Sequence, residues 1–324
     1  MEALSAAKSE NAMATQRQIC PTLQSHYDLP ATAKIKFLKT PEAQDLFDNI
    51  PQDVSQILRH SFLEGQHGSD VPNWNLVVDF FQRNSRIIPA LTQNPGTYTM
   101  LEKMYHFQPV WGPIDNYFKI GKAGQALRNR FDIINALAVF HMNEILGRQN
   151  QCLVIDIGSG PGRNGIEMCL RNPNIRNKVQ IDCIEIDQGA VIKGRELLTQ
   201  HGLINIEFVQ TSMTRLRNRY PGNVDYGLLV GILCGLPHVE RVDLLKSIKS
   251  YFKPGSKLVA ASLLEKMAED DLLCAYILRE TTGWGLQYRA LGKLKDAFEE
   301  SGWKYEEFFQ EEPTKFYEIG IGIA

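Results

Sequence analysis

The chain has 324 residues, of which 44% are hydrophobic, and it carries a formal net charge of -2 at pH 7. This composition is that of an ordinary globular protein with one large domain or two smaller ones. Since no basic domain or tail is present, we expect neither nucleic acid nor a membrane surface as a partner. The sequence shows no secretory signal and no run of eighteen apolar residues, which predicts a cytoplasmic protein.

The cysteines and histidines give no sign of a metal site. Six cysteines are scattered along the chain without the paired spacing of a zinc site or the density of a disulfide scaffold. The seven histidines do not cluster with carboxylates or cysteines. We therefore expect no metal, and cysteines that behave as small apolar residues.

The first 120 residues divide into two predicted parts. Residues 1–25 are polar and poor in aromatics, which predicts disorder. Residues 26–120 are predicted to form a helical N-terminal region, because apolar side chains between Pro41 and Thr92 recur at helical spacing. This region ends in an aromatic cluster made of Tyr98, Tyr105, Phe107, Trp111, Tyr117 and Phe118.

Residues 121–324 are predicted to form a second domain of the α/β class. A long amphipathic helix is expected over 121–146, followed by strands that alternate with helices. The expected strands cover 152–157, 179–185, 205–210, 224–231 and 257–263, and the helices 163–171, 189–201, 212–218 and 239–252. Two last strands, 303–309 and 316–323, are separated by a short acidic link and are expected to pair as an antiparallel hairpin.

A glycine-rich turn follows the first strand of this domain. The apolar run from Cys152 ends in Asp156, and Gly158, Gly160 and Gly162 come next at alternate positions. The apolar run predicts a strand buried on both faces, and the glycines let the backbone turn sharply and approach a ligand closely. An ordinary strand-to-helix turn seldom needs three glycines.

This segment resembles the first motif of the class I S-adenosylmethionine-dependent methyltransferases, an acid followed by Gly-x-Gly-x-Gly. The resemblance covers residues 151–324 and implies a Rossmann-like sheet of seven strands with the terminal hairpin. It also implies S-adenosylmethionine as cofactor, with Asp156 acting on its amino end and Gly158, Ser159, Gly160 and Gly162 forming the turn around it. The same glycines satisfy the dinucleotide fingerprint Gly-x-Gly-x-x-Gly, so a nicotinamide-dependent oxidoreductase is the first alternative.

The remaining cofactor residues are expected at the ends of the next three strands. Glu185 ends the second strand and can accept hydrogen bonds from both ribose hydroxyls, with Ile186 beside it. Asp182 competes for this role only if the strand register differs, and Asp187 is expected to cap the following helix. After the third strand the family usually has an acid for the adenine amino group; here Ser212 and Met213 take its place. Gly231, the last residue of the predicted fourth strand, completes the set.

The catalytic and acceptor-binding residues carry weaker signals. His238 is the candidate general base because of its place after the fourth strand and its titration range, although a histidine at a helix start is often a surface residue. Cys234 is predicted to line the acceptor pocket. Tyr105, Trp111 and Tyr117 are predicted to contact the acceptor as a lid, with packing in the core as the equal alternative.

Together these residues predict a methyltransferase that acts on a small molecule, with the acceptor atom left open. Methyl transfer chiefly requires the alignment of nucleophile, methyl carbon and sulfur, because the sulfonium is already electrophilic. A catalytically silent, methyltransferase-like binding subunit is the second alternative, because Ser212 replaces the usual acid and no clear base is present. A homodimer is compatible with the sequence.

Overall fold

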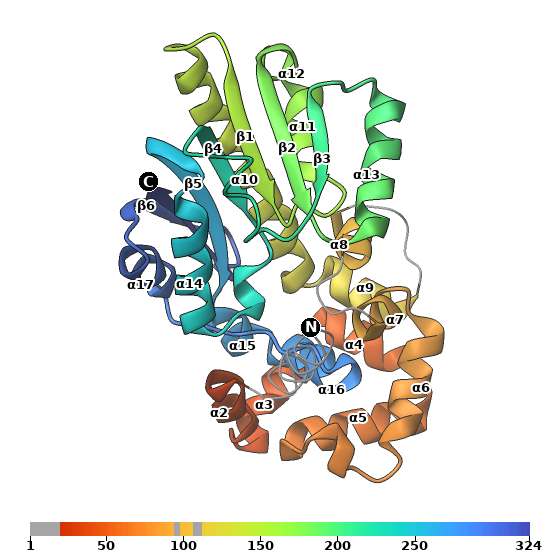
Figure 1. The fold of residues 1–324 in the computed structure, drawn as a ribbon. Helices are drawn as coiled ribbons and strands as arrows, with labels where there is room; N and C mark the ends of the chain where they lie inside the picture. The colour runs from red at the N-terminus through yellow and green to blue at the C-terminus, as the bar shows by residue number, and fades with distance from the viewer. Residues whose placement is uncertain (1–19, 94–97, 106–111) are drawn as a thin grey trace, which may run out of the picture. The chain divides into compact units, whose positions relative to one another are not determined.

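The computed structural model describes residues 20–93, 98–105 and 112–324, and its chain separates into two compact units (Figure 1). The helical unit contains the residues up to Arg128 together with 263–290 and 312–316, and the sheet unit contains 129–262, 291–311 and 317–324. The sequence pattern predicted one boundary between these two parts, near residue 120. The later segments join the helical unit through contacts between residues far apart in sequence, which local patterns do not record.

The helical unit is built from short helices and two later insertions. Its helices are α2 (Pro21–Tyr27), α3 (Ala31–Leu38), α4 (Pro41–Asp48), α5 (Gln52–Glu64), α6 (Trp74–Asn84), α7 (Ile87–Gln93), α8 (Tyr98–Tyr105), α9 (Pro113–Ile120), α15 (Lys266–Asp270) and α16 (Leu272–Thr282), with the 3₁₀ turn η1 (Gly68–Asp70). Helix α2 begins inside the segment 1–25 that was predicted to be disordered. Its Leu23 and Tyr27 are buried, which gives this short helix a packed face.

Helix α16 forms the centre of the helical unit. Tyr276 packs edge-on against Phe62 and Trp74, and Tyr27 donates a hydrogen bond of 2.9 Å to Glu280. Nearly all of its side chains are buried, so the helix has no polar face. A helix that is buried on nearly all sides lacks the amphipathic period, which is why the sequence pattern did not predict it.

The sheet unit has seven strands in the order β3-β2-β1-β4-β5-β7-β6. The strands are β1 (Cys152–Ile157), β2 (Val179–Glu185), β3 (Ile206–Gln210), β4 (Val224–Leu229), β5 (Phe252–Leu263), β6 (Lys304–Gln310) and β7 (Tyr317–Ile323). Strands β1 to β5 pair in parallel, and β6 pairs antiparallel with β7. The predicted class I sheet with its terminal hairpin is therefore confirmed.

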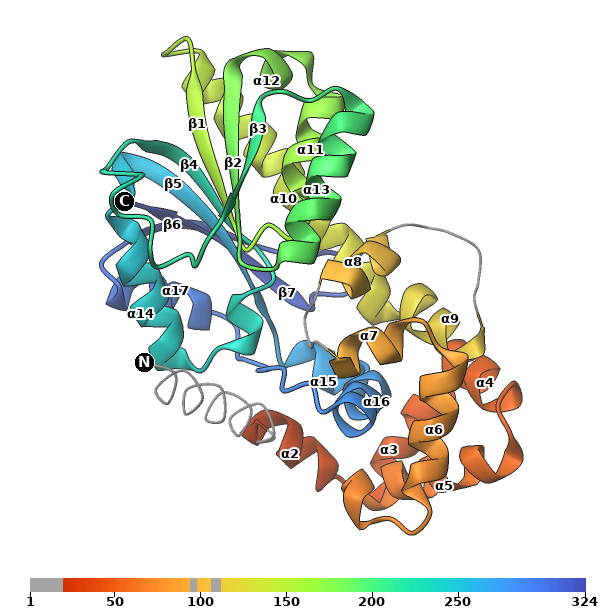
Figure 2. The same ribbon diagram turned by 45° about the vertical axis from the view of Figure 1, so that its right-hand side comes forward.

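Helices cover both faces of this sheet (Figure 2). One face packs against α10 (Lys122–Leu146), α11 (Arg163–Arg171) and α13 (Gln188–His201), through a core that includes Ile134, Ile166 and Val191. The other face packs against α14 (His238–Lys249) and α17 (Lys293–Glu300). The parallel strands are thus buried on both sides, which their continuous apolar runs predict.

The connection after β3 corrects one prediction. The helix expected over 212–218 is wrong: hydrogen-bonded turns take its place, with the Arg215 amide donating to the Ser212 carbonyl at 3.0 Å. The hydroxyls of Ser212 and Thr214 lie 3.1 Å apart, and such side chains compete with the backbone for the bonds a helix needs. A short helix that was not predicted, α12 (Pro173–Lys178), precedes β2.

No helix within the described residues is long and apolar enough to span a membrane.

Candidate functional site

The glycine turn joins the carboxyl end of β1 to the start of α11. Gly158, Gly160 and Gly162 have φ angles of 67°, 54° and 73°. This left-handed conformation disfavours any residue with a Cβ. The Gly162 amide donates to the Ser159 carbonyl at 3.0 Å and so closes the turn.

Gly162 is confined from the side as well as by its backbone. A Cβ at this position would lie 2.9 Å from Cζ of Phe208 and 3.1 Å from Sγ of Cys183. The turn therefore rests directly on β2 and β3. Helix α11 starts at the next residue, and its N-terminal turn offers backbone amides and a partial positive charge to an anion.

Glu185 at the end of β2 is bound to the glycine turn. Its Oε2 accepts from the Gly160 amide at 2.8 Å, and its Oε1 accepts from the amides of Ile186 and Asp187 at 2.7 and 2.9 Å. A carboxylate offers about four acceptor positions, so Oε2 keeps one for a ligand. The backbone thus fixes the orientation of the residue predicted to bind ribose.

The neighbouring acids of β2 have other partners. Asp182 accepts hydrogen bonds from Tyr220 at 2.6 Å and Arg219 at 3.3 Å, which holds the loop after β3 against the strand. Asp187 caps α13 by accepting from the Ala190 amide at 2.8 Å, as predicted. Of these three acids, Glu185 is the one bonded to the turn.

Asp156 lies beneath the turn and is 1% exposed. Burial is the main cause that raises the pKa of its carboxyl to about 7; a hydrogen bond from Asn164 opposes the rise, and the charge of Glu185 adds to it. Within the described part of the chain, Asp156 Oδ2 and Asn164 Oδ1 are buried acceptors without a hydrogen-bond partner. The sequence assigned no role to Asn164, although it stands in the glycine motif.

The ends of β3 and β4 lie at the same edge of the sheet. The Thr211 amide donates to the Glu185 carbonyl at 3.0 Å, and Met213 accepts from the Tyr251 hydroxyl at 3.1 Å through its carbonyl. A Cβ on Gly158 would lie 2.2 Å from Cδ1 of Ile232, so the turn also approaches the segment after β4. Parallel strands bring their carboxyl ends together, which is why all the predicted cofactor residues meet here.

Ile186 and Gly231 both lie at this edge of the sheet. Ile186 follows Glu185 and is 70% exposed, an apolar surface beside a polar carboxylate. A Cβ at Gly231 would meet no atom within 4 Å. Cys234, in the 3₁₀ turn η2 (Leu233–Gly235), is buried, and its thiol donates to the Gly231 carbonyl at 3.4 Å.

The predicted base His238 forms a surface ion pair. Its Nε2 lies 3.0 Å from Glu300 Oε2 on α17, and both side chains are at least one third exposed. This contact fits the alternative of a surface residue at a helix start. The catalytic role of His238 stays a prediction.

The predicted acceptor-contacting aromatics belong to the helical unit or are not described. Tyr117 is buried in the core of that unit, and its hydroxyl donates to Asp271 at 3.1 Å. These contacts match the alternative of core packing. Tyr105 ends α8, and Trp111 lies outside the described residues.

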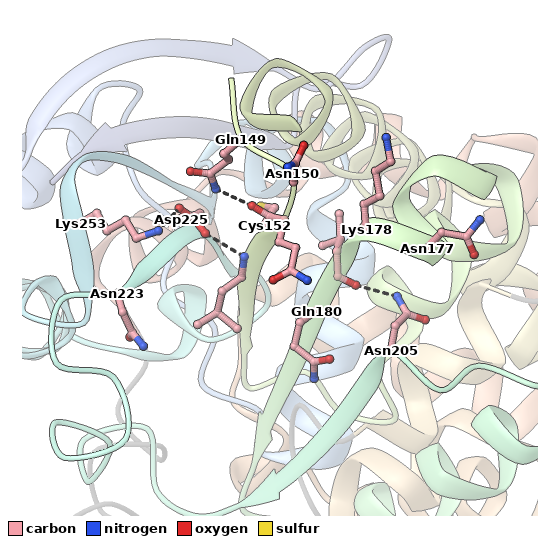
Figure 3. A pocket seen from close by; sticks show the side chains of 13 residues that line it. Gln149, Asn150, Cys152, Asn177, Lys178, Gln180, Asn205, Asn223, Asp225 and Lys253 are labelled. Atoms are coloured by element: carbon pink, nitrogen blue, oxygen red, sulfur yellow. Dashed lines mark hydrogen bonds and ion pairs between the residues drawn. The ribbon is translucent and has the colours of Figure 1, made fainter. Parts of the chain in front are cut away.

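A polar pocket lies at the amino edge of the same sheet (Figure 3). It has a volume of about 850 Å³ and is lined mainly by amide side chains that precede the strands, among them Asn150, Asn177 and Asn223. Here Asp225 accepts from Lys253 at 2.5 Å and from the Leu153 amide at 2.8 Å. Within the described residues, no group of three metal-ligating side chains gathers at either edge.

Comparison with known proteins identifies the sheet unit. Residues 148–305 match the family described as methyltransferase domain. The chain contains a class I methyltransferase domain. The family predicted from the glycine motif is thus confirmed, and S-adenosylmethionine is the cofactor of that family. No curated protein matches the chain.

Two solved structures show the same fold as the methyltransferase domain and its flanking helices. Magnesium protoporphyrin IX methyltransferase from Synechocystis PCC 6803, with bound S-adenosylhomocysteine, has a TM-score of 0.51 and 12% identity, over 77% of this chain and 98% of that one. A protein from Bordetella parapertussis described as a possible exported protein has a TM-score of 0.56 and 14% identity, over 93% and 98%. At these identities the likeness concerns the fold alone.

The residues of the turn fit an S-adenosylmethionine ligand. Glu185 has a free acceptor position for ribose, and the buried Asp156 carries an unpartnered carboxylate oxygen close to the start of α11. A dinucleotide-binding sheet continues with parallel strands, whereas β7 here runs antiparallel to β6. The methyltransferase domain therefore agrees with the methyl donor rather than with a nicotinamide.

Proposed function

We propose that the chain transfers the methyl group of S-adenosylmethionine to a small-molecule acceptor. The observation that carries this proposal is the bond between Glu185 and the Gly160 amide, which locks a ribose-binding carboxylate onto a left-handed glycine turn. The turn alone is compatible with two cofactors. The methyltransferase domain match supports the methyl donor.

Each residue of the site has a part in holding the cofactor. Glu185 accepts from the ribose hydroxyls, and the start of α11 receives the carboxylate of the methionine end. Ile186 offers its exposed apolar side chain to the adenine ring, and Met213 and Ser212 border the same ring. Gly158, Ser159, Gly160 and Gly162 form the cradle, because the positive φ of the three glycines lets the backbone turn here toward the ligand.

When bound, the cofactor supplies an electrophilic methyl carbon on a sulfonium. The residues of the chain then have to orient this carbon toward the acceptor and keep water away. Gly231 lies where the fourth strand ends, with open space at its Cβ position, and Cys234 is bonded to its carbonyl. This segment is the proposed boundary between cofactor and acceptor.

Proton removal from the acceptor is the least defined step. His238 is the proposed base, and it would have to leave Glu300 to act. An acceptor that loses its proton to water needs no such group. The near-neutral charge of the chain supports a small molecule over nucleic acid.

Calorimetric titration with S-adenosylhomocysteine and, separately, with NADH tests the donor. We expect binding of the first and none of the second; the reverse result would refute the proposal. Incubation with labelled S-adenosylmethionine and a metabolite extract then tests transfer, and mass spectrometry identifies the labelled acceptor.

A catalytically silent binding subunit is the second candidate. It is favoured by Ser212, which stands where the family usually has an acid, and by the ion pair that engages His238. This candidate predicts binding of S-adenosylhomocysteine without labelling of any metabolite or protein fraction. Labelling of one defined compound would exclude it.

A further inference from the structure

Near the glycine turn, Asp156 and Asn164 each carry one buried oxygen that has no hydrogen-bond partner among the described residues. Asp156 is 1% exposed, and its Oδ2 has no hydrogen-bond partner among the described residues. The same holds for Oδ1 of Asn164, on the first turn of α11. A buried polar atom without a partner is unfavourable, so each of these two atoms needs an explanation.

The two side chains are joined to each other. Asn164 donates a hydrogen bond to Asp156, and one acceptor atom on each side chain stays unsatisfied. An ionised Asp156 keeps an unpaired negative oxygen in an apolar surrounding, and burial disfavours that state. A proton on Oδ2 removes this penalty in the free protein.

Few other charges act on Asp156. In the sheet it lies between Cys183 of β2 and Leu228 of β4, and β2 ends in Glu185, whose charge also favours the protonated form. Burial raises the pKa of the Cys183 thiol well above its usual range, so that neighbour stays neutral. A positive charge brought to the turn would therefore favour the loss of a proton from Asp156.

We propose that Asp156 and Asn164 form a proton-holding pair beneath the glycine turn, and that a ligand with a cationic amino-acid end binds tightly once Asp156 has lost its proton to solvent. Asp156 is too buried for contact with the ligand, so it acts through its charge, and Asn164 acts through its hydrogen bond to Asp156; both are positioning residues. The proposal rests on the proposed function, because it takes S-adenosylmethionine or its product as the ligand.

The geometry explains why the amino end matters. The start of α11 would attract the carboxylate of an amino acid, and the ammonium on the adjacent carbon would then come near the end of β1. At short range and low dielectric, an ammonium favours the ionised form of a neighbouring acid. Binding should thus release a proton wherever Asp156 is protonated beforehand.

Titration calorimetry of the full chain with S-adenosylhomocysteine between pH 6 and pH 8 tests the proposal. We expect affinity to rise about 10-fold across this range, and about half a proton to be released at pH 7, measured in buffers of different ionisation enthalpy. Methylthioadenosine, which lacks the amino-acid end, serves as the matched ligand and should bind with no pH dependence. A flat profile for S-adenosylhomocysteine in the wild-type protein would overturn the proposal.

Two variants identify the group that titrates. Asp156→Asn should bind S-adenosylhomocysteine with no pH dependence and no proton release. This result would show that the proton comes from Asp156 and not from the amino group of the ligand. Asn164→Leu removes the donor that opposes protonation, so the rise in affinity should move to higher pH. An unmoved profile, or an equal loss at every pH, would contradict the role of Asn164.

Proton release is measured on the wild-type protein, so the proposal can still be tested if either substitution impairs folding. Failure to bind S-adenosylhomocysteine at any pH would instead count against the proposed function. Binding without proton release would leave that function standing and reject the pair.

Discussion

The two edges of the parallel sheet are both polar, but they use their polar groups differently. At the amino edge, Asp225 is satisfied by Lys253 and the Leu153 amide, inside a recess of about 850 Å³. At the carboxyl edge, Asp156 and Asn164 keep buried acceptors without described partners. The carboxylate at the amino edge is thus paired with a cation, whereas the carboxylate at the candidate site keeps a buried oxygen without a described partner.

The largest expected effect comes from the glycine turn. Gly160→Val places a branched side chain at a φ of 54°, and we expect affinity for S-adenosylhomocysteine to fall at least about 100-fold, roughly 3 kcal/mol. Gly222→Val is the matched control, because Gly222 has a φ of 71° beside the amino edge and a Cβ there would meet only ordinary contacts, 3.8 Å from the Phe252 carbonyl oxygen and 4.0 Å from that of Ser250. Equal loss of binding in both variants would show that backbone strain alone is responsible.

The next effect is a pH dependence of stability that we expect from Asp156 at the carboxyl edge. The folded-state pKa of Asp156 is about 7 and its unfolded value is near 3.8, so its contribution to stability is present below the unfolded value and is lost as pH rises through 7. We expect the wild-type protein to lose about 2–3 kcal/mol between pH 5 and pH 8 that Asp156→Asn does not lose. Urea unfolding at both pH values measures this, and identical pH dependence in the two proteins would contradict the assignment.

Asp225→Ala should lower the free energy of unfolding by about 2 kcal/mol, because it leaves Lys253 and the Leu153 amide unpaired at the amino edge. Affinity for S-adenosylhomocysteine should stay within twofold of the wild-type value. Thermal unfolding and calorimetry supply the two measurements. A large loss of affinity would mean that the two edges do not act independently.

Glu185→Gln keeps the shape of the side chain and removes its charge. We expect about 10-fold weaker binding of S-adenosylhomocysteine and also of methylthioadenosine, because both carry the ribose. Asp156→Asn should affect only the first ligand. If Glu185→Gln left the affinity for methylthioadenosine unchanged, the assignment of Glu185 to the ribose would be wrong.

The smallest effect is expected at the surface pair of the α14 start. His238→Ala should change stability by less than about 0.5 kcal/mol and leave S-adenosylhomocysteine binding intact, since exposed ion pairs contribute little. Labelling of the acceptor then decides the catalytic question. Loss of transfer with intact binding would assign His238 as the base.

The local pattern predicted those features that depend on neighbouring residues. The apolar run of β1, the alternate glycines and the helical period of α10 each lie in one continuous segment, and the class I sheet follows from their order. The cap formed by Asp187 was readable for the same reason. The prediction of a helix over 212–218 was wrong, because the hydroxyl side chains of Ser212 and Thr214 bond to each other there and compete with the helical backbone bonds.

What the sequence determined by itself is the methyltransferase domain, its glycine turn and the donor these imply, because each signal is short-range. Only the tertiary structure decided that α16 completes the helical unit, that Tyr117 is buried in that unit, and that Asp156 and Asn164 meet beneath the turn. These outcomes depend on burial and on contacts between distant segments. Residue type and spacing do not record how much water a side chain loses on folding.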